Sequence, residues 1–223
     1  MIAVQGKSAL RVLACALAVA LLLPSSAAGQ AGTAQDLFTH AQGLDREGKH
    51  AEAVAAFRRA CTAGHAESCT AVGMRYAEGS GVTQDVQRAA EFYQLGCDGD
   101  SFAACSALGT MYADGMGVAK YEPRARELFQ QACNGGFAPA CTALGVRYAQ
   151  AFGAERNEPR AAQLYEQACK GGDPEGCANL GVVFRDGTGV HRDRMRAAVL
   201  FRRACDAGSA AGCRYLNEAP PKR

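Results

Sequence analysis

Cysteines at regular positions constrain this chain more than any other feature. Ten of its eleven cysteines form five pairs; the members of a pair are eight positions apart, and each pair lies 36 positions after the previous one. The pairs are Cys61 and Cys69, Cys97 and Cys105, Cys133 and Cys141, Cys169 and Cys177, and Cys205 and Cys213. A period of roughly 20–50 residues marks an array of stacked repeats. Because the register is kept without insertion or deletion, we predict a single repeat domain.

Other residue types recur with the same 36-residue period. The recurring columns are a glycine (Gly73, Gly109, Gly145, Gly181), an aromatic residue three positions later (Tyr76, Tyr112, Tyr148, Phe184) and an alanine (Ala89, Ala125, Ala161, Ala197) with an aromatic residue four positions after it (Tyr93, Phe129, Tyr165, Phe201). Spacings of three and four are helical. Each repeat therefore contains two predicted helices, over 66–78 and 87–97 in the first full repeat. We predict an all-α fold, a right-handed α/α solenoid of helical hairpins.

Glycine-rich segments separate the two helices of a repeat. The segment 79–82, Gly-Ser-Gly-Val, has counterparts at 115–118 and 187–190, and glycines of this kind supply the positive φ that ends a helix. The predicted helix-start residues are Asp85, Asn157 and Asp193 as N-caps and Pro123 and Pro159 in the first turn. Segment 151–154 lacks the first glycine, so we expect a differently shaped loop there.

The first 28 residues have the layout of a secretory signal peptide. Lys7 and Arg11 precede an apolar run of 12 residues, Val12 to Leu23, and small residues follow up to Ala28. The run is shorter than the about 20 residues that a membrane-spanning helix needs. We expect cleavage after Ala28, which also removes Cys15, and an exported protein, periplasmic or extracellular, with no stable membrane insertion afterwards.

The predicted organisation follows from the leader and the period. It comprises a signal peptide at 1–28, a short linker at 29–33, one solenoid domain at 34–217 and a tail at 218–223. Within the domain we expect an amino-terminal hairpin at 34–62, repeats at about 63–98, 99–134, 135–170 and 171–206, and a closing helix at 209–217. End units that differ from the interior are typical of repeat arrays, because each end has one face without a neighbour.

Charge gives no indication of a nucleic-acid partner. The chain has 24 basic and 22 acidic residues and no tryptophan, and removal of the leader takes away two of the basic residues. A neutral chain with interspersed signs does not attract nucleic acid or anionic membranes over long range. We therefore expect no nucleic-acid partner, and we expect a monomer.

The even cysteine count of an exported chain indicates a disulfide framework. The first member of each pair closes one helix and the second begins the next, and helices packed about 8–10 Å apart bring such positions within bridging reach. The spacing favours the pairing eight positions apart, with Cys69 to Cys97 as the alternative. Zinc ligands are usually two to four positions apart and include histidine, whereas the four histidines here are not periodic. We expect no metal and no cofactor.

The motifs together resemble a known repeat family. Ala-Cys, a seven-residue turn, Cys, and then Leu-Gly-x-x-Tyr, Gly-x-Gly-Val and Arg-Ala are similar to Sel-1-like repeats, which are related to the tetratricopeptide repeat. The disulfide-containing form with a leader resembles the Helicobacter cysteine-rich protein family. The resemblance covers about residues 34–217. It implies an exported helical solenoid that contacts other proteins, or one that binds penicillin and acts as a weak β-lactamase.

The residues themselves provide no catalytic constellation. A serine β-lactamase needs Ser-x-x-Lys, and no serine of this chain is followed by lysine at that spacing; Ser-Asp-Asn and Lys-Thr-Gly are also absent. We therefore name no catalytic residue, and a β-lactamase activity follows from the resemblance alone.

The resemblance also implies where a ligand binds. In tetratricopeptide-like solenoids, the side of the first helix that faces away from the buried Leu-Gly-Tyr positions lines a concave groove. The candidate binding residues on that side are Ala71, Met74, Arg75, Met111, Arg147, Asn179 and Val183. Related repeats use an asparagine at the position of Asn179 to hold a peptide backbone or a carboxylate. We expect a scaffold whose concave face binds a protein, a peptide or a cell-wall fragment, the alternative being a weak β-lactamase or penicillin-binding hydrolase.

Overall fold

The computed structural model describes residues 27–152 and 155–218, with side chains from Ala34 onward. The predicted signal peptide, up to residue 26, and the tail, from residue 219, lie outside the described residues. The regular elements of the described part are all helices: α1 (Ala27–Arg46), α2 (His50–Thr62), α3 (Ala66–Glu78), α4 (Val86–Asp98), α5 (Phe102–Asp114), α6 (Glu122–Asn134), α7 (Ala138–Ala149), α8 (Glu158–Lys170), α9 (Pro174–Asp186), α10 (Arg194–Asp206) and α11 (Ala210–Glu218). Helix α1 thus includes residues 29–33, for which the sequence predicts a linker.

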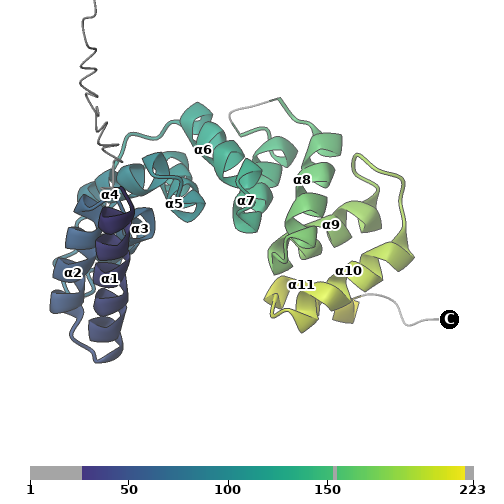
Figure 1. Cartoon of the computed structure of the whole chain (residues 1–223). Helices are drawn as coiled ribbons and strands as arrows, with labels where there is room; N and C mark the ends of the chain where they lie inside the picture. The colour runs from purple at the N-terminus through teal and green to yellow at the C-terminus, as the bar shows by residue number, and fades with distance from the viewer. Residues whose placement is uncertain (1–26, 153–154, 219–223) are drawn as a thin grey trace, which may run out of the picture.

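Successive helices form hairpins that stack into an arch (Figure 1). The most extensive contacts are within the pairs α1–α2, α3–α4, α5–α6, α7–α8 and α9–α10, and α11 closes the array against α10. The predicted all-α solenoid is confirmed. The first full repeat has its helices at 66–78 and 86–98, within one residue of the bounds that the periodicity predicts.

Polar caps and glycines set the ends of the helices. The side-chain oxygens of Asp85, Asn157 and Asp193 each accept a hydrogen bond from the backbone N–H three residues later, which satisfies donors that a helix start leaves unpaired. At the other end of the first helix, Gly79 and Gly115 take left-handed conformations, with φ of 74° and 77°. These predicted caps and glycine turns are confirmed.

The loop after α7 differs from its counterparts, as its sequence predicts. Without the first glycine, α7 ends at Ala149, its C-cap Gln150 has a φ of −105°, and Ala151 takes the left-handed conformation instead, with a φ of 59°. The loop nevertheless returns to the same place: the N–H of Asn157 donates to the carbonyl of Tyr148 at 2.9 Å, as the N–H of Asp85 donates to Tyr76 at 2.9 Å. The altered loop therefore preserves the packing of the repeat.

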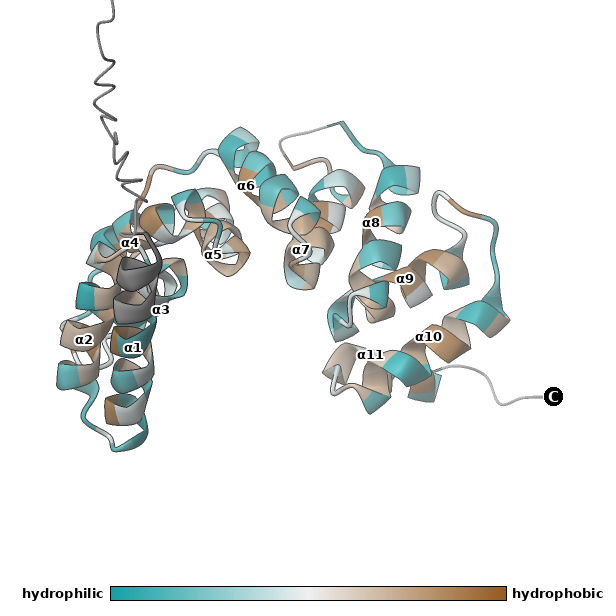
Figure 2. Cartoon of the chain, in the orientation of Figure 1, coloured by the Kyte–Doolittle hydropathy of each residue, from teal (hydrophilic) through white to brown (hydrophobic). Residues whose placement is uncertain are grey.

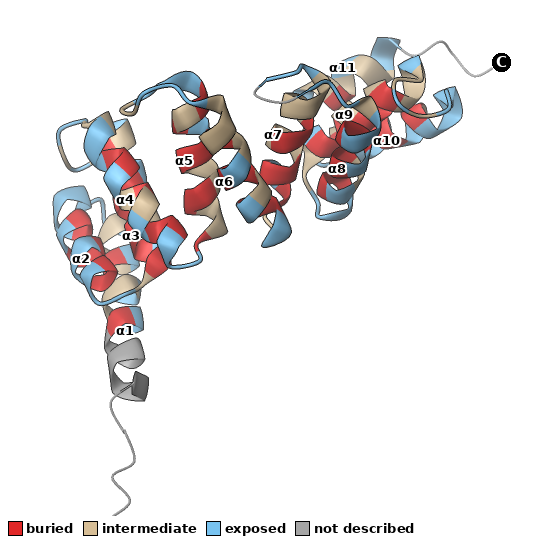
Figure 3. Cartoon of the chain, turned by 90° about the horizontal axis from the view of Figure 1, so that it is seen from above, coloured by how far each residue is buried: buried red, intermediate tan, exposed pale blue. Residues whose placement is uncertain are grey.

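A close approach of glycine and aromatic ring holds each hairpin together. A Cβ built on Gly145 would lie 2.6 Å from the ring of Tyr165, and one on Gly73 would lie 2.7 Å from Tyr93. The aliphatic residue before each glycine is buried (Val72, Leu108, Leu144 and Leu180). Figure 3 shows the buried residues on the faces where helices meet, with the exposed residues on the outside and in the loops.

All five disulfides join cysteines eight positions apart. The bridges are Cys61–Cys69, Cys97–Cys105, Cys133–Cys141, Cys169–Cys177 and Cys205–Cys213. The Cα atoms of each pair are between 4.4 and 4.8 Å apart, a distance that suits a bridge without movement of the backbone. Each bridge links the second helix of one repeat to the first helix of the next, so the favoured pairing is confirmed.

Candidate binding face

The first helices of the repeats lie on the inner side of the arch. Helices α3 and α5, α7 and α9, and α9 and α11 contact each other across repeats, whereas neighbouring second helices do not contact to a comparable extent in the described part of the chain. Elements on the inside of a curve are closer together than those on the outside. Figure 1 agrees, with α5 and α7 on the inner side and α6 on the outer side. In Figure 2, α6 and α8 carry long hydrophilic stretches, whereas α5 and α7 are mostly apolar.

Helix geometry identifies the residues that face away from the second helix. The glycine column contacts the aromatic ring of the partner helix. Residues two positions before or after each glycine lie roughly 200° around the helix from it. Those residues are Ala71 and Arg75 around Gly73, Ala107 and Met111 around Gly109, Ala143 and Arg147 around Gly145, and Asn179 and Val183 around Gly181. The two columns thus mark the side of the first helices that faces the inside of the arch.

The seven predicted site residues differ in how far their side chains are exposed to solvent. Met74 is 47% exposed, and Ala71, Arg75, Arg147 and Asn179 are partly buried. Met111 and Val183 are buried, at 4% and 7% exposure. These two side chains belong to the core of the array and offer little surface to a ligand.

The two arginines of the candidate site form ion pairs with carboxylates of the preceding hairpin. Arg75 donates to the carboxylate of Asp45 at 2.5 Å and to the hydroxyl of Ser80 at 3.2 Å, so it ties α3 to the preceding hairpin. Arg147 lies 3.4 Å from a carboxylate oxygen of Glu122 on α6, in a partly buried position. Their guanidinium groups are therefore engaged within the chain.

Arg147 is also enclosed by aromatic rings. Its guanidinium carbon lies 5.4 Å from the ring centroid of Phe129 and 5.6 Å from that of Phe152. Both distances are within the reach of a cation–π contact. Phe152, in the altered loop, is 43% exposed. The loop after α7 thus places an exposed aromatic ring at the edge of the candidate site.

Met74 belongs to a column of the inner helices whose other members are not among the predicted site residues. Met74 has three counterparts in the following repeats, Thr110, Val146 and Val182. Thr110 is exposed, and the two valines are partly exposed. The 36-residue period relates all four positions, so extending the prediction for Met74 along the period would have found them.

Asn179 differs in chemistry from its counterparts. It is partly buried on α9, and its amide makes no hydrogen bond within the described residues, while alanines stand at the same position of α3, α5 and α7. The amide has donors and an acceptor available for a ligand. The inner face therefore carries one amide and a row of small and aliphatic side chains.

The phenol groups of two buried tyrosines have raised pKa values. Burial raises the pKa of Tyr93 to about 12 and the pKa of Tyr165 to about 12, because a phenolate is poorly solvated away from water. Near Arg185, hydrogen bonding lowers the pKa of Asp186.

In the described ranges, no group of three or more His, Cys, Asp or Glu side chains is placed to hold a metal ion. None of the described helices is long and apolar enough to cross a membrane.

The raised phenol pKa values predict late tyrosine ionisation. The unfolded phenol ionises near pH 10, so the stability from the two neutral phenols is complete below pH 10 and is lost as pH rises toward 12. In a titration followed by phenolate absorbance, we expect a separate component near pH 12, and the Tyr165→Phe variant should reduce it. A single transition near pH 10 in a chain whose circular dichroism remains helical would contradict the prediction.

Comparison with known proteins gives the same repeat. The sequence profile of the Sel1 repeat matches four segments, residues 66–101, 102–137, 138–173 and 174–209. They have the predicted period, and each starts three residues after a predicted repeat start, at the beginning of a first helix. No curated protein matches this sequence.

Solved structures with a similar fold include several bacterial proteins. A Sel1 repeat protein from Oxalobacter formigenes is 27% identical, with a TM-score of 0.76, over 82% of this chain and 74% of that protein. The protein c5321, a protective antigen of uropathogenic Escherichia coli, is 26% identical with a TM-score of 0.76 over 86% of this chain. The chain spans only 42% of the length of c5321. Cysteine-rich protein B of Helicobacter pylori is 25% identical over 60% of this chain and 96% of its own, with a TM-score of 0.49.

Proposed function

The chain belongs to the Sel1 repeat family, and from that premise we propose that it is an exported scaffold that binds a protein segment or peptide along its concave face. A cell-wall peptide is included in this class of ligand. The observation that carries the proposal is the continuous inner face of α3, α5, α7 and α9. There Met74 and Thr110 are exposed, Val146 and Val182 are partly exposed, and Asn179 lies one helical turn before Val182.

A rigid face of this composition favours an extended ligand. Small and aliphatic side chains allow a backbone to approach closely, and an amide can pair with a peptide group. Arg75 and Arg147 hold the repeats in register through pairs with Asp45 and Glu122, and the disulfides do the same at every turn between repeats. A face that is already ordered loses less entropy when a ligand binds.

The cysteines support the export part of the proposal. Every cysteine within the described residues is in a disulfide, and such bonds persist in oxidising compartments and are rare in the cytosol. The sequence of residues 1–28, with its basic start and apolar run, is consistent with a leader to such a compartment.

The proposal is tested by partner capture with variants of the inner face. The immobilised, oxidised protein is exposed to envelope extract and to an array of periplasmic peptides. We expect retained ligands whose affinity falls roughly fivefold or more in Met74→Asp or Asn179→Ala, the effect of about 1 kcal/mol that marks a contributing contact.

A matched variant on a second helix serves as the control. Met195, on α10, is 69% exposed, so Met195→Asp changes surface charge as Met74→Asp does, without altering the inner face. Failure to retain any ligand, or an equal effect of the control and the inner-face variants, would overturn the proposal. Saturable turnover of nitrocefin that a single substitution abolishes would favour the hydrolase alternative instead.

A further inference from the structure

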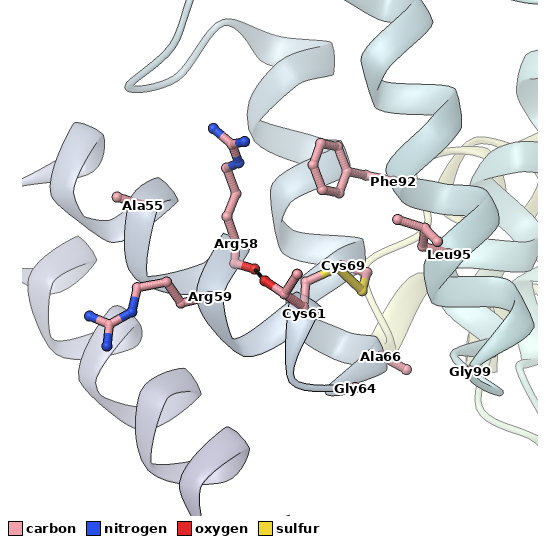
Figure 4. A pocket seen from close by; sticks show the side chains of 11 residues that line it. Ala55, Arg58, Arg59, Cys61, Gly64, Ala66, Cys69, Phe92, Leu95 and Gly99 are labelled. Atoms are coloured by element: carbon pink, nitrogen blue, oxygen red, sulfur yellow. Dashed lines mark hydrogen bonds between the residues drawn. A yellow bond between two sulfur atoms is a disulfide. The ribbon is translucent and has the colours of Figure 1, made fainter.

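A second recessed surface lies away from the inner face, between the second helices α2 and α4 (Figure 4). It is a groove of about 730 Å³. Arg58 and Arg59 of α2 border it on one side, and Phe92 and Leu95 of α4 border it on the other. The Cys61–Cys69 disulfide and the turn between α2 and α3 form its floor. We call this surface the α2–α4 groove.

Two of the three equivalent grooves further along the array, α6–α8 and α8–α10, are bridged by side chains. Gln167 of α8 donates to the carbonyl of Cys133 at 3.4 Å, and Arg203 of α10 donates to the carbonyl of Cys169 at 2.9 Å. The period places Leu95 at the same position of α4. A leucine has no donor for the carbonyl of Cys61, and its side chain is 54% exposed. The polar bridge is thus replaced by an apolar wall.

The exposure of the disulfide reflects this difference. Cys61 is 9% exposed, whereas its counterparts in the interior of the array, Cys97, Cys133 and Cys169, are 2%, 0% and 2% exposed. Cys205, at the end of the array, is partly exposed. Phe92, whose counterparts Leu128 and Leu164 are fully buried, is only partly buried and stacks on Tyr76 with the ring centroids 5.6 Å apart. The apolar wall of the α2–α4 groove, formed by Phe92 and Leu95, is therefore open to solvent in the first full repeat.

The charge at the edge of the groove has one sign. Arg58 and Arg59 are the charged residues among those that line it. Both are exposed, and neither side chain forms an ion pair with another described residue. In Figure 4 the two guanidinium groups point in different directions. A single terminal carboxylate would reach one of them, whereas a segment with carboxylates on separate residues would reach both.

We propose that the α2–α4 groove binds an acidic peptide segment of a partner protein, with a bulky apolar side chain seated on Phe92 and Leu95 and carboxylates paired with Arg58 and Arg59. The apolar side chain removes the exposed leucine and phenylalanine from water. The carboxylates complement the unpaired guanidinium groups. This site is separate from the inner face, so one chain can hold two segments.

The test measures binding of a panel of fluorescein-labelled, carboxy-terminally amidated peptides by fluorescence anisotropy. The peptides vary in the number of glutamates and carry leucine, phenylalanine or alanine at the centre. We expect affinity to increase with both the glutamates and the apolar residue, and to decrease with added salt. The double variant Arg58→Gln/Arg59→Gln should lower the affinity about tenfold, and Leu95→Gln, which restores the residue type of α6 and α8, about fivefold.

The array supplies a control for the loss of positive charge. Arg202 is the counterpart of Arg58 on α10 and is exposed, so Arg202→Gln removes a positive charge from an equivalent helix position outside the groove and should leave the affinity unchanged. Circular dichroism melting confirms that each variant is folded. Acidic apolar peptides that bind no better than neutral or alanine peptides, or an equal loss in Arg202→Gln, would overturn the proposal. Inner-face variants such as Met74→Asp should leave the affinity for the acidic peptides unchanged. Failure of this proposal can therefore be distinguished from failure of the proposal for the concave face.

Discussion

Full reduction of the five disulfides is expected to unfold the chain at room temperature. Each bridge closes a loop of eight residue positions, and the chain-entropy relation gives about 2.5 kcal/mol for a loop of that size. The unfolding free energy of a typical domain is about 5–15 kcal/mol. Loss of all five contributions removes most of that range. The measurement is thermal and urea unfolding by circular dichroism, with and without excess dithiothreitol.

The position of a disulfide in the array determines how much of the chain is destabilised when that disulfide is removed. In Cys133→Ala/Cys141→Ala the missing bridge lies at the middle of the array, and both cysteines are buried. We therefore expect the free energy of unfolding of the whole chain to fall by about 2.5 kcal/mol or more. In the matched variant Cys205→Ala/Cys213→Ala the bridge joins the last two helices, where both cysteines are partly exposed. Because a repeat contacts only its neighbours, hydrogen exchange should increase in α11 alone. A reduced chain that keeps its melting temperature would contradict the first prediction.

Gly117→Ala is expected to destabilise the protein by about 2–5 kcal/mol. Gly117 has a φ of +70°, and a Cβ there would overlap the backbone carbonyl of Val86 at the start of α4, in the preceding repeat. The left-handed conformation costs a residue with a Cβ roughly 1–2 kcal/mol, and forced overlap in a packed region adds about 1–3 kcal/mol. The overlap involves backbone, so no side-chain rotation relieves it. Urea unfolding at constant m-value measures the change.

Gly136→Ala separates the two contributions. Gly136 also has a left-handed conformation, with a φ of +90°, but no atom lies within 4 Å of the Cβ that would be added. Its variant should therefore show only the conformational cost of about 1–2 kcal/mol. Equal destabilisation by the two substitutions would mean that the contact between Gly117 and Val86 contributes nothing, and that the glycine loop does not hold neighbouring repeats together.

The fold could be predicted largely from the sequence because a solenoid is built from local contacts. A 36-residue period, helical spacings, caps such as Asp85 and glycines such as Gly79 each determine structure over a few residues, and stacking repeats them along the chain. The altered loop after α7 was also predictable, because the missing glycine removes the residue that tolerates positive φ. Ala151 then takes that conformation, which the sequence alone did not reveal.

The candidate site was harder to predict, because exposure depends on how closely neighbouring helices approach. Arg75 and Met111 occupy the same column, yet one is partly exposed and paired with Asp45 and the other is 4% exposed. Similarly, Leu95 appears in the sequence as an ordinary helical leucine. Only its place beside α2, without the bridge that Gln167 and Arg203 provide, leaves a groove open.

The sequence by itself determined the repeat, the class of fold, the helix ends and the favoured partner of each cysteine, because all of these depend on residues that are close in the chain. The tertiary structure decided which inner-face side chains a ligand can reach, which arginines are already paired, and where the outer surface is hollowed. Those properties depend on the distance between helices of different repeats. That distance is set by the packing of each hairpin on the next, through contacts such as that of Gly117 with the backbone of Val86 and the disulfide at each turn between repeats.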